Sequence, residues 1–297
     1  MDSPRYFPYA EDAQILRTAL KPLALDAWIE VDRNLAGELH EKHRLLAERH
    51  DDVALFLQSS RSAGGEVLRL LVEHLITRYP DWYRRGNGMV EVVPAALRVD
   101  LSERAHPLET AARLVQEDLC VLEASAAGYR LTGAVLCAPS YWRLADKLGK
   151  PLLDVHAPVP GYAAKLAAPV DRVFAALRPD RPVWRVNWSV TNSPRLFQPS
   201  RDEPDPQASD DVTAEDAGER LIVRVERQTI RRLPETRAIL FTIKVYVDAL
   251  ARVAEQPGMA AALRRAIEAL SEAELDYKSM RGLRAPLLSY LARFAGV

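Results

Sequence analysis

Hydrophobic and polar residues alternate strictly over one stretch, and this is the clearest pattern in the chain. Between residues 184 and 190 every second residue is apolar, and those between carry a guanidinium, an amide and a hydroxyl group. This period of two predicts a strand with one apolar face and one polar face. An alternating stretch at about 221–229 and a mostly apolar stretch at 238–247 predict two more strands, joined by a turn that contains Pro234.

In other parts of the chain the apolar residues have a different spacing. Short apolar runs before and after the Ala-Gly turn at 127–128 predict two paired strands. Leu16 and Leu20 indicate a short helix near the N-terminus. Apolar residues three and four positions apart predict longer helices at about 35–50, 63–78, 108–118 and 259–270.

These elements predict an α+β fold in three parts. We expect a helical N-terminal extension at 1–89, a strand-rich core at 90–250 and a helical C-terminal extension at 251–297. Within the core, residues 200–219 are acidic, contain proline and lack periodicity, which predicts a mobile, solvated insertion. The chain lacks a regular βαβ order and a G-x-G-x-x-G motif, which argues against a Rossmann fold.

Composition narrows the classes of function. The chain has 297 residues, a hydrophobic fraction of 48% and a net charge of -1, so it lacks the basic character of a nucleic-acid-binding protein. Its two cysteines are too few for a cysteine zinc site or a disulfide framework, and no C-x-x-C-H motif is present for c-type haem. We find no signal-peptide pattern and no apolar run long enough for a membrane span, and we expect a cytoplasmic protein.

His156 has the most constrained setting of the six histidines. It follows an apolar run and precedes Ala157-Pro158-Val159-Pro160-Gly161, whose prolines restrict the backbone and exclude a helix. A stiff loop suits a ligating or acid–base side chain, because little entropy is lost when the side chain is oriented. The alternative is a structural histidine that is hydrogen-bonded at the end of a strand. Spacing alone leaves both interpretations open.

An imidazole in this position could be a general base, a zinc ligand or an axial ligand of haem iron. Zinc requires further ligands, and none is spaced nearby. Haem requires one protein ligand, an apolar slot and cations for its propionates. The residues that could line the slot are Trp142, Phe174, Trp184, Trp188, Phe197 and Phe241. The residues that could pair with propionates are Lys165, Arg185, Arg224 and Arg227.

Several sequence blocks in a fixed order resemble one family, the haem-dependent oxidative N-demethylase alpha-subunit-like proteins. The resemblance spans nearly the whole chain, from Pro8-Tyr9 to Tyr277-Lys278-Ser279, and leaves out the acidic insertion. The blocks are Val115-Gln116-Glu117-Asp118-Leu119-Cys120, Cys137-Ala138-Pro139-Ser140-Tyr141-Trp142-Arg143, Lys147-Leu148-Gly149, His156-Ala157-Pro158-Val159-Pro160-Gly161, Trp184-Arg185-Val186-Asn187-Trp188 and Arg224-Val225-Glu226-Arg227-Gln228-Thr229.

The resemblance implies a PAS-like antiparallel sheet that binds b-type haem, with helical extensions. It implies a monooxygenase that uses O₂ to remove a methyl group from a small secondary amine, such as dimethylamine, and releases formaldehyde. Electrons would come from NADPH through separate partner subunits that carry FMN and an iron–sulfur cluster. The role of axial metal ligand is carried onto His156, whose second ring nitrogen could donate to Asp154 or to a backbone carbonyl.

The strand faces suggest roles for other residues. We expect Arg224, Glu226 and Gln228 to act in catalysis, as proton donors or, for Glu226, as a partner of an ammonium substrate. A cross-strand ion pair between Glu226 and Arg227 is the alternative. The expected cofactor-binding residues are His156, Lys165, Trp184, Arg185, Trp188 and Arg227. Two other functions remain open at this point: a haem-binding PAS-like sensor and a non-catalytic interaction module.

Overall fold

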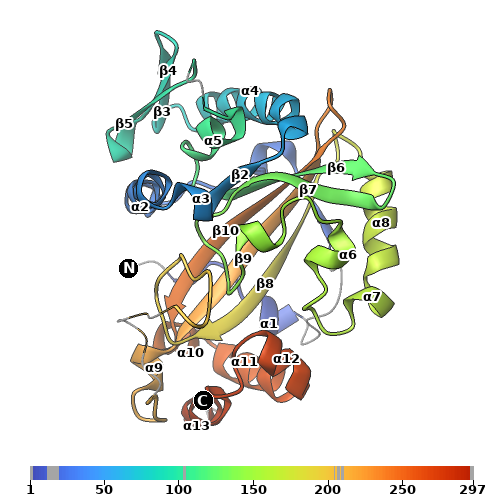
Figure 1. The fold of residues 1–297 in the computed structure, drawn as a ribbon. Coiled ribbons are helices and arrows are strands. Elements are labelled where there is room, and N and C mark those ends of the chain that lie inside the picture. Colours follow the sequence, from blue (N-terminus) through green and yellow to red (C-terminus); the bar gives the residue numbers. More distant parts are fainter. Residues whose placement is uncertain are drawn as a thin grey trace.

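The computed structural model describes residues 3–11, 20–102, 105–203, 205, 208 and 211–294. The short helix expected around Leu16 and part of the acidic insertion at 200–219 lie outside these residues. The fold is mixed α+β and contains antiparallel sheets, as the sequence predicts (Figure 1). Within the described residues, no helix has both the length and the apolar character needed to cross a membrane.

A seven-stranded antiparallel sheet forms the centre of the molecule, in the order β1-β8-β9-β10-β6-β7-β2 (Figure 1). The strands expected from the alternating stretches are confirmed, and the two longest of them lie side by side in the middle. The strands are β1 (Lys21–Pro22), β2 (Ala54–Phe56), β6 (Asp118–Ser125), β7 (Gly128–Val135), β8 (Val183–Thr191), β9 (Ile222–Arg232) and β10 (Ile239–Ala249).

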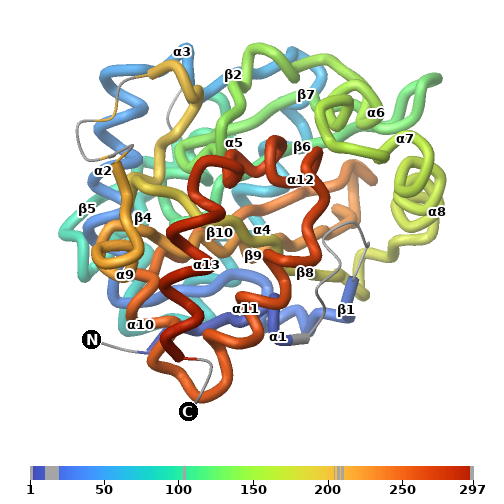
Figure 2. Tube along the Cα trace, turned by 90° about the horizontal axis from the view of Figure 1, so that it is seen from below, coloured from blue at the N-terminus to red at the C-terminus, as the bar shows by residue number. Residues whose placement is uncertain are grey.

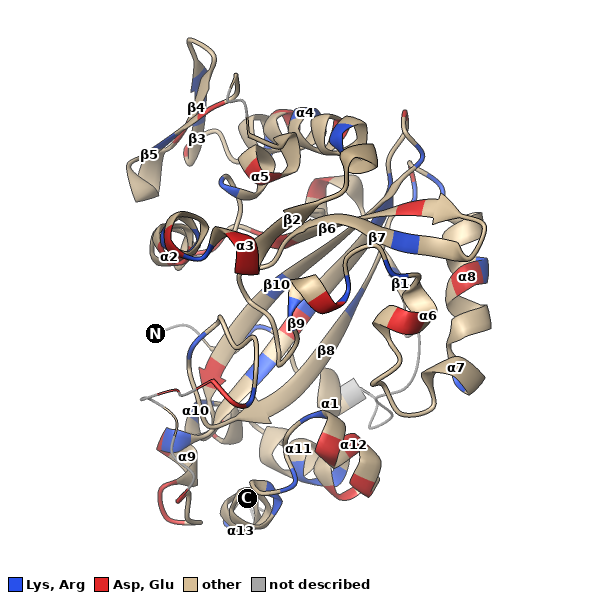
Figure 3. Ribbon diagram, viewed as in Figure 1, with Lys and Arg blue, Asp and Glu red and all other residues tan. Residues whose placement is uncertain are grey.

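Register places the polar residues of two strands in one row. Arg185 on β8 lies opposite Gln228 on β9, and Asn187 lies opposite Glu226. Because side chains alternate across a strand, these four share one face of the sheet. Charged residues therefore lie near the start of β8 and in the middle of β9 (Figure 3).

Three short helices cover the same face, which we call the α6–α8 face. Leu152 of α6 (Leu152–Val155) and Phe174 of α8 (Ala167–Ala176) pack with Ile230 and Ile239 of the sheet. Between these helices lies α7 (Tyr162–Lys165). Leu166 separates α7 from α8. Pro169 belongs to the first turn of α8, where a missing amide donor is tolerated.

The opposite face, which we call the extension face, is covered by both ends of the chain. Leu240 and Val121 pack with the N-terminal helices, and Trp188 and Val225 pack with the C-terminal helices. The two groups of helices are α2 (Leu35–Glu48), α3 (His50–Val53), α4 (Arg61–Arg78) and α5 (Pro107–Ala112), and α9 (Ala217–Arg220), α10 (Leu250–Ala254), α11 (Met259–Glu268), α12 (Glu272–Tyr277) and α13 (Arg284–Ala292).

The two ends also contact each other. Helix α1 (Pro8–Glu11) packs against α11, and α11 packs against α13 (Figure 2). A separate three-stranded sheet, whose strands are β3 (Tyr83–Gly86), β4 (Met89–Val92) and β5 (Leu97–Asp100), joins the N-terminal core through Val90 and Val92. The expected helix at 108–118 is shorter than predicted: α5 ends at Ala112, and β6 begins at Asp118.

Parts of the acidic insertion contact the body of the protein. Glu203 forms an ion pair with Arg49, and Asp205 accepts a hydrogen bond from Ser193. Ala217, in α9 at the end of the insertion, is buried in the C-terminal core.

Candidate functional site

His156 lies at the C-terminal end of α6, and not at a strand end as the structural interpretation of the sequence assumed. Its Nδ1 lies 2.9 Å from the carbonyl oxygen of Leu152. A carbonyl can only accept a hydrogen bond, so Nδ1 carries the proton and Nε2 keeps its lone pair. The acceptor for this ring nitrogen of His156 is thus a backbone carbonyl, and not the side chain of Asp154, which was the other candidate.

The surroundings of His156 hold the ring still and keep it neutral. The ring stacks on Tyr162 of α7, with centroids 4.4 Å apart and an angle of 12° between the planes. Burial lowers the pKa of His156 to about 4, and the positive charges of Lys147 and Arg185 act in the same direction, against the hydrogen bond to Leu152. A neutral imidazole with a free Nε2 is the form that binds a metal.

Glu226 is the centre of the polar row on the sheet. Its Oε1 accepts a hydrogen bond from Ser140 at 2.7 Å, and its Oε2 accepts from Gln228 at 2.9 Å and from Asn187 at 3.3 Å. Three donors therefore hold the carboxylate in place. The side chains of Glu226, Asn187 and Gln228 are only partly buried, so a small molecule can approach them.

Arg224 holds loops in place instead of reaching into the site. Its buried guanidinium donates to Ser140 Oγ at 2.9 Å and to the carbonyl oxygens of Ala138 at 2.7 Å, Leu196 at 3.0 Å and Arg195 at 3.2 Å. These bonds attach two loops to the sheet. Arg224 thus acts on Glu226 indirectly, because it positions the Ser140 hydroxyl.

Arg185 has an unusual environment for a cation. Its Nε is buried and has no hydrogen-bond partner among the described residues. Burial lowers the pKa of Arg185, although the nearby Glu226 and Tyr277 oppose this effect. Its charge also acts on His156, so the two side chains are neighbours across the α6–α8 face. A buried guanidinium Nε without a hydrogen-bond partner among the described residues fits an anionic group that the polypeptide does not supply.

The structure does not bring all the expected cofactor-binding residues together. Trp184, Trp188 and Arg227 point to the extension face, because they alternate with Arg185 and Glu226 along their strands. Trp184 and Trp188 contact Tyr6 and Tyr9 of the N-terminal segment, respectively.

Arg227 is occupied on the extension face. It forms an ion pair with Glu30, at 3.2 Å, and donates to the carbonyl oxygens of Ala27 and Trp28. The cross-strand pair with Glu226, which was the alternative for that carboxylate, is therefore not formed. Lys165 is exposed on α7.

Several contributors to the site were missed from the sequence. Ser140, which lies in one of the family-like sequence blocks, binds Glu226 through its hydroxyl. Tyr162 gave no signal beyond its place after the proline-rich loop. Lys278, about 90 residues away from Asn187, donates to that side chain at 3.2 Å. The period of two put Asn187, Glu226 and Gln228 on the polar face, and the family-like blocks included Ser140 and Lys278 without indicating a role for them.

Apolar side chains border the polar row. Phe241 contacts three clusters on the α6–α8 face, and Phe174 and Trp142 each belong to one of them. Of the six aromatic residues that could line a slot, these three lie on the same face as His156. Phe197 instead packs in the N-terminal core.

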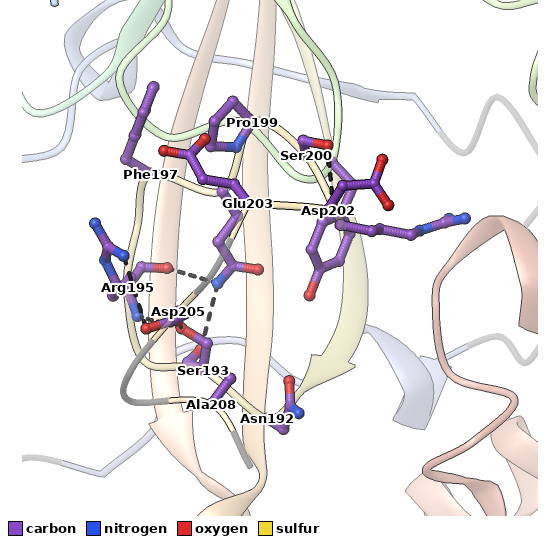
Figure 4. A pocket seen from close by; sticks show the side chains of 13 residues that line it. Asn192, Ser193, Arg195, Phe197, Pro199, Ser200, Asp202, Glu203, Asp205 and Ala208 are labelled. Atoms are coloured by element: carbon purple, nitrogen blue, oxygen red, sulfur yellow. Dashed lines mark hydrogen bonds and ion pairs between the residues drawn. The ribbon is translucent and has the colours of Figure 1, made fainter. Parts of the chain in front are cut away.

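A polar cavity of about 360 Å³ lies next to this site, and it is lined by Tyr141, by residues between 192 and 203, and by Asp205 and Ala208 (Figure 4). Inside it, Gln198 donates to the carbonyl oxygens of Ser193 and Arg195. Tyr141, which lines the cavity, directly follows Ser140, which donates to Glu226.

One comparison with known proteins bears on this arrangement. A family model described as "Haem-dependent oxidative N-demethylase, alpha subunit-like" matches residues 19–288, which is most of the chain. The match includes His156, the polar row of β8 and β9, and Lys278.

Proposed function

The chain belongs to the haem-dependent oxidative N-demethylase alpha-subunit-like family, and from this premise we propose that it is the haem-binding subunit of a monooxygenase. The proposed reaction removes a methyl group from a small secondary amine such as dimethylamine and releases formaldehyde. The observation that carries the proposal is the neutral His156, whose Nε2 lone pair is free, on the same face as a row of polar side chains.

The residues on this face fit a b-type haem in a PAS-like setting. His156 offers one nitrogen ligand, and the carbonyl of Leu152 fixes its orientation and increases its basicity. Phe241, Phe174 and Trp142 supply apolar walls. The unpaired Nε of Arg185 suits a propionate carboxylate.

The bound haem would supply the chemistry of O₂ activation. With two electrons and two protons, one oxygen atom of O₂ would enter a methyl C–H bond and the other would leave as water. The resulting carbinolamine breaks its C–N bond to give formaldehyde and the demethylated amine. We assign to Glu226 the binding of the substrate N–H group, because its carboxylate is held by three neutral donors and is partly exposed. Gln228 keeps that carboxylate aligned.

Electrons would come from partner subunits that use NADPH and carry FMN and an iron–sulfur cluster. An iron–sulfur cluster of the common type needs four cysteine ligands, and the chain has two. Both are buried, and burial raises the pKa values of the Cys120 and Cys137 thiols. This supports a division of labour between subunits.

Haem binding by a His156→Ala variant tests the proposal. Wild-type protein titrated with haemin should give a Soret band, and the variant should bind haem at least about 10-fold more weakly and have altered ligand-field bands. His40→Ala, which changes an exposed histidine on α2, is the matched control and should behave as the wild type. An unchanged spectrum of His156→Ala would exclude this ligand.

Turnover separates the enzyme from a haem-binding sensor. Reconstituted protein with a flavin and iron–sulfur reductase, NADPH and dimethylamine should release formaldehyde in proportion to the NADPH consumed. Haem binding without formaldehyde from any small methylated amine would favour the sensor. Failure to bind haem would favour the interaction module.

A further inference from the structure

Lys278 connects the C-terminal extension to the polar row of the sheet. It directly follows α12, and its side chain is buried. Its ammonium group donates to Asn187 Oδ1 at 3.2 Å and to the carbonyl oxygen of Trp188. The Nδ2 of Asn187 in turn donates to Glu226 Oε2 at 3.3 Å. A chain of hydrogen bonds thus runs from Lys278 to the carboxylate at the centre of the site.

The chemistry of the three groups fixes the direction in which these hydrogen bonds are donated. An ammonium group can only donate, so Asn187 must turn its oxygen toward Lys278. A carboxylate can only accept, so the NH₂ group of Asn187 must face Glu226. The amide is therefore held at both ends. Loss of either partner would leave Asn187 free to rotate and would weaken its hydrogen bond to the other.

Burial of a lysine at this position carries a cost in stability. Within the described part of the chain Lys278 forms no ion pair, and burial lowers its pKa to about 8. The next residue, Ser279, has a left-handed backbone with φ of 58°, and its buried Oγ has no hydrogen-bond partner among the described residues. A buried cation without an ion pair and a strained non-glycine residue both disfavour folding, and such features concentrate at functional sites.

We propose that Lys278 is a positioning residue for Glu226, acting through Asn187, and that it couples the C-terminal extension to substrate binding. The charged or titratable groups that face Lys278 are Glu226 on β9, Arg185 on β8 and Glu274 on α12. The positioning of Glu226 follows from the hydrogen bonds alone. The effect on the amine substrate rests on the proposed function.

The side-chain amide signals of Asn187 test the positioning role directly in haem-free protein. In ¹H–¹⁵N spectra of the full chain, assigned by their loss in Asn187→Leu, these signals should shift in Lys278→Met. The shift should be toward the positions found in Glu226→Gln, where the carboxylate acceptor is absent. Lys150→Met, which changes an exposed lysine, is the matched control and should leave them in place. Unchanged signals in Lys278→Met would overturn the proposal.

Lys278→Gln keeps a donor and provides a second test if Lys278→Met does not fold. Its Asn187 signals should lie between those of the wild type and those of Glu226→Gln. Positions identical to the wild type would count against the proposal.

The coupling to function needs a double-mutant cycle on the reconstituted enzyme. Lys278→Met should raise the KM for the amine about 10-fold or more, with a smaller effect in a Glu226→Gln background, because Lys278 acts through Glu226. Fully additive effects would overturn the coupling. Absence of turnover in the wild type would reject the proposed function and leave the spectroscopic result intact.

Discussion

The imidazole of His156 is held at two points that do not depend on each other. The carbonyl of Leu152 fixes which nitrogen carries the proton, and the ring of Tyr162 fixes the plane of the imidazole. Ligand residues with such support lose less conformational entropy when they bind a metal. The stacked ring should therefore contribute to haem affinity without touching the iron.

Replacement of Tyr162 by Leu should speed the loss of haem by about 10-fold, the lower end of the effects seen when support of a ligand is removed. Tyr162→Phe keeps the stacked ring and should retain haem like the wild type, so it serves as the matched control. Transfer of haem to an excess of apomyoglobin, followed in the Soret region, measures the rate. Equal rates for the Leu and Phe variants would show that stacking does not support the ligand.

Whether the place of a residue could be predicted depends on how far away in sequence its interaction partners lie. The period of two assigned Arg185, Asn187 and Glu226 to one face, because alternation is a local property of a strand. The same rule, applied to Trp184, Trp188 and Arg227, would have removed them from the site. Glu30 as the partner of Arg227 could not be predicted, because the two are far apart in sequence and only the fold brings them together.

Among the strands, β9 organises most of the site. Its residues on the α6–α8 face carry out different tasks along one line: Arg224 holds loops, Glu226 offers a carboxylate, Gln228 supports it, and Ile230 packs on α8. The pairing with β8 and β10 fixes the spacing between these residues. Loss of one anchor should therefore loosen loops and leave the sheet in place.

Arg224→Met should lower the free energy of unfolding by about 2–4 kcal/mol, because the carbonyl oxygens of Ala138 and Leu196 would be left buried without donors. Arg224→Lys keeps a charge but reaches fewer acceptors, so its loss should be intermediate. Urea denaturation of haem-free protein measures both. Arg98→Met, at an exposed position on β5, should change stability by no more than about 0.5 kcal/mol. Equal stability of Arg224→Met and wild type would contradict this role.

Element positions were predictable to the extent that their causes are local. The strands at 184–190, 221–229 and 238–247 and the helix at 63–78 follow from periodicity. The helical segments around His156 were harder, because a four-residue helix shows barely one period. Strand order was not predictable either, since pairing such as that of β10 with β6 depends on contacts between distant segments.

In the whole molecule, both extensions pack on the extension face of the sheet, and the C-terminal extension also reaches the polar row of the other face through Lys278. Two histidines next to the N-terminal core pack in their neutral form. His74 on α4 lies against Trp28, and its Nε2 is buried without a partner among the described residues. His106 caps α5 and stacks on Phe56, with ring centroids 4.0 Å apart. Both must stay uncharged for this packing to persist.

The cap formed by His106 explains why protonation should loosen the extension. Its Nδ1 accepts a hydrogen bond from the backbone N–H of Leu108, so Nδ1 has no proton, and its Nε2 lies 3.3 Å from Ser60 Oγ. Burial and the charge of Arg61 lower the pKa of His106 to about 4, and burial lowers that of His74 to about 4. An unfolded histidine has the ordinary value of about 6.5.

Acid should therefore destabilise the protein between about pH 6.5 and pH 4. In this range the unfolded chain binds protons that the folded chain does not, so the free energy of unfolding falls as the pH falls, and the loss is complete below the folded pKa.

His106→Asn keeps an N-cap acceptor but cannot titrate. Because His106 is partly exposed, its share of the loss should be on the order of 1–2 kcal/mol. Urea denaturation at pH 7 and pH 4.5 measures it: the difference should be smaller in His106→Asn than in the wild type, and unchanged in His40→Asn. Equal differences in all three proteins would show that His106 does not hold the extension through a neutral imidazole.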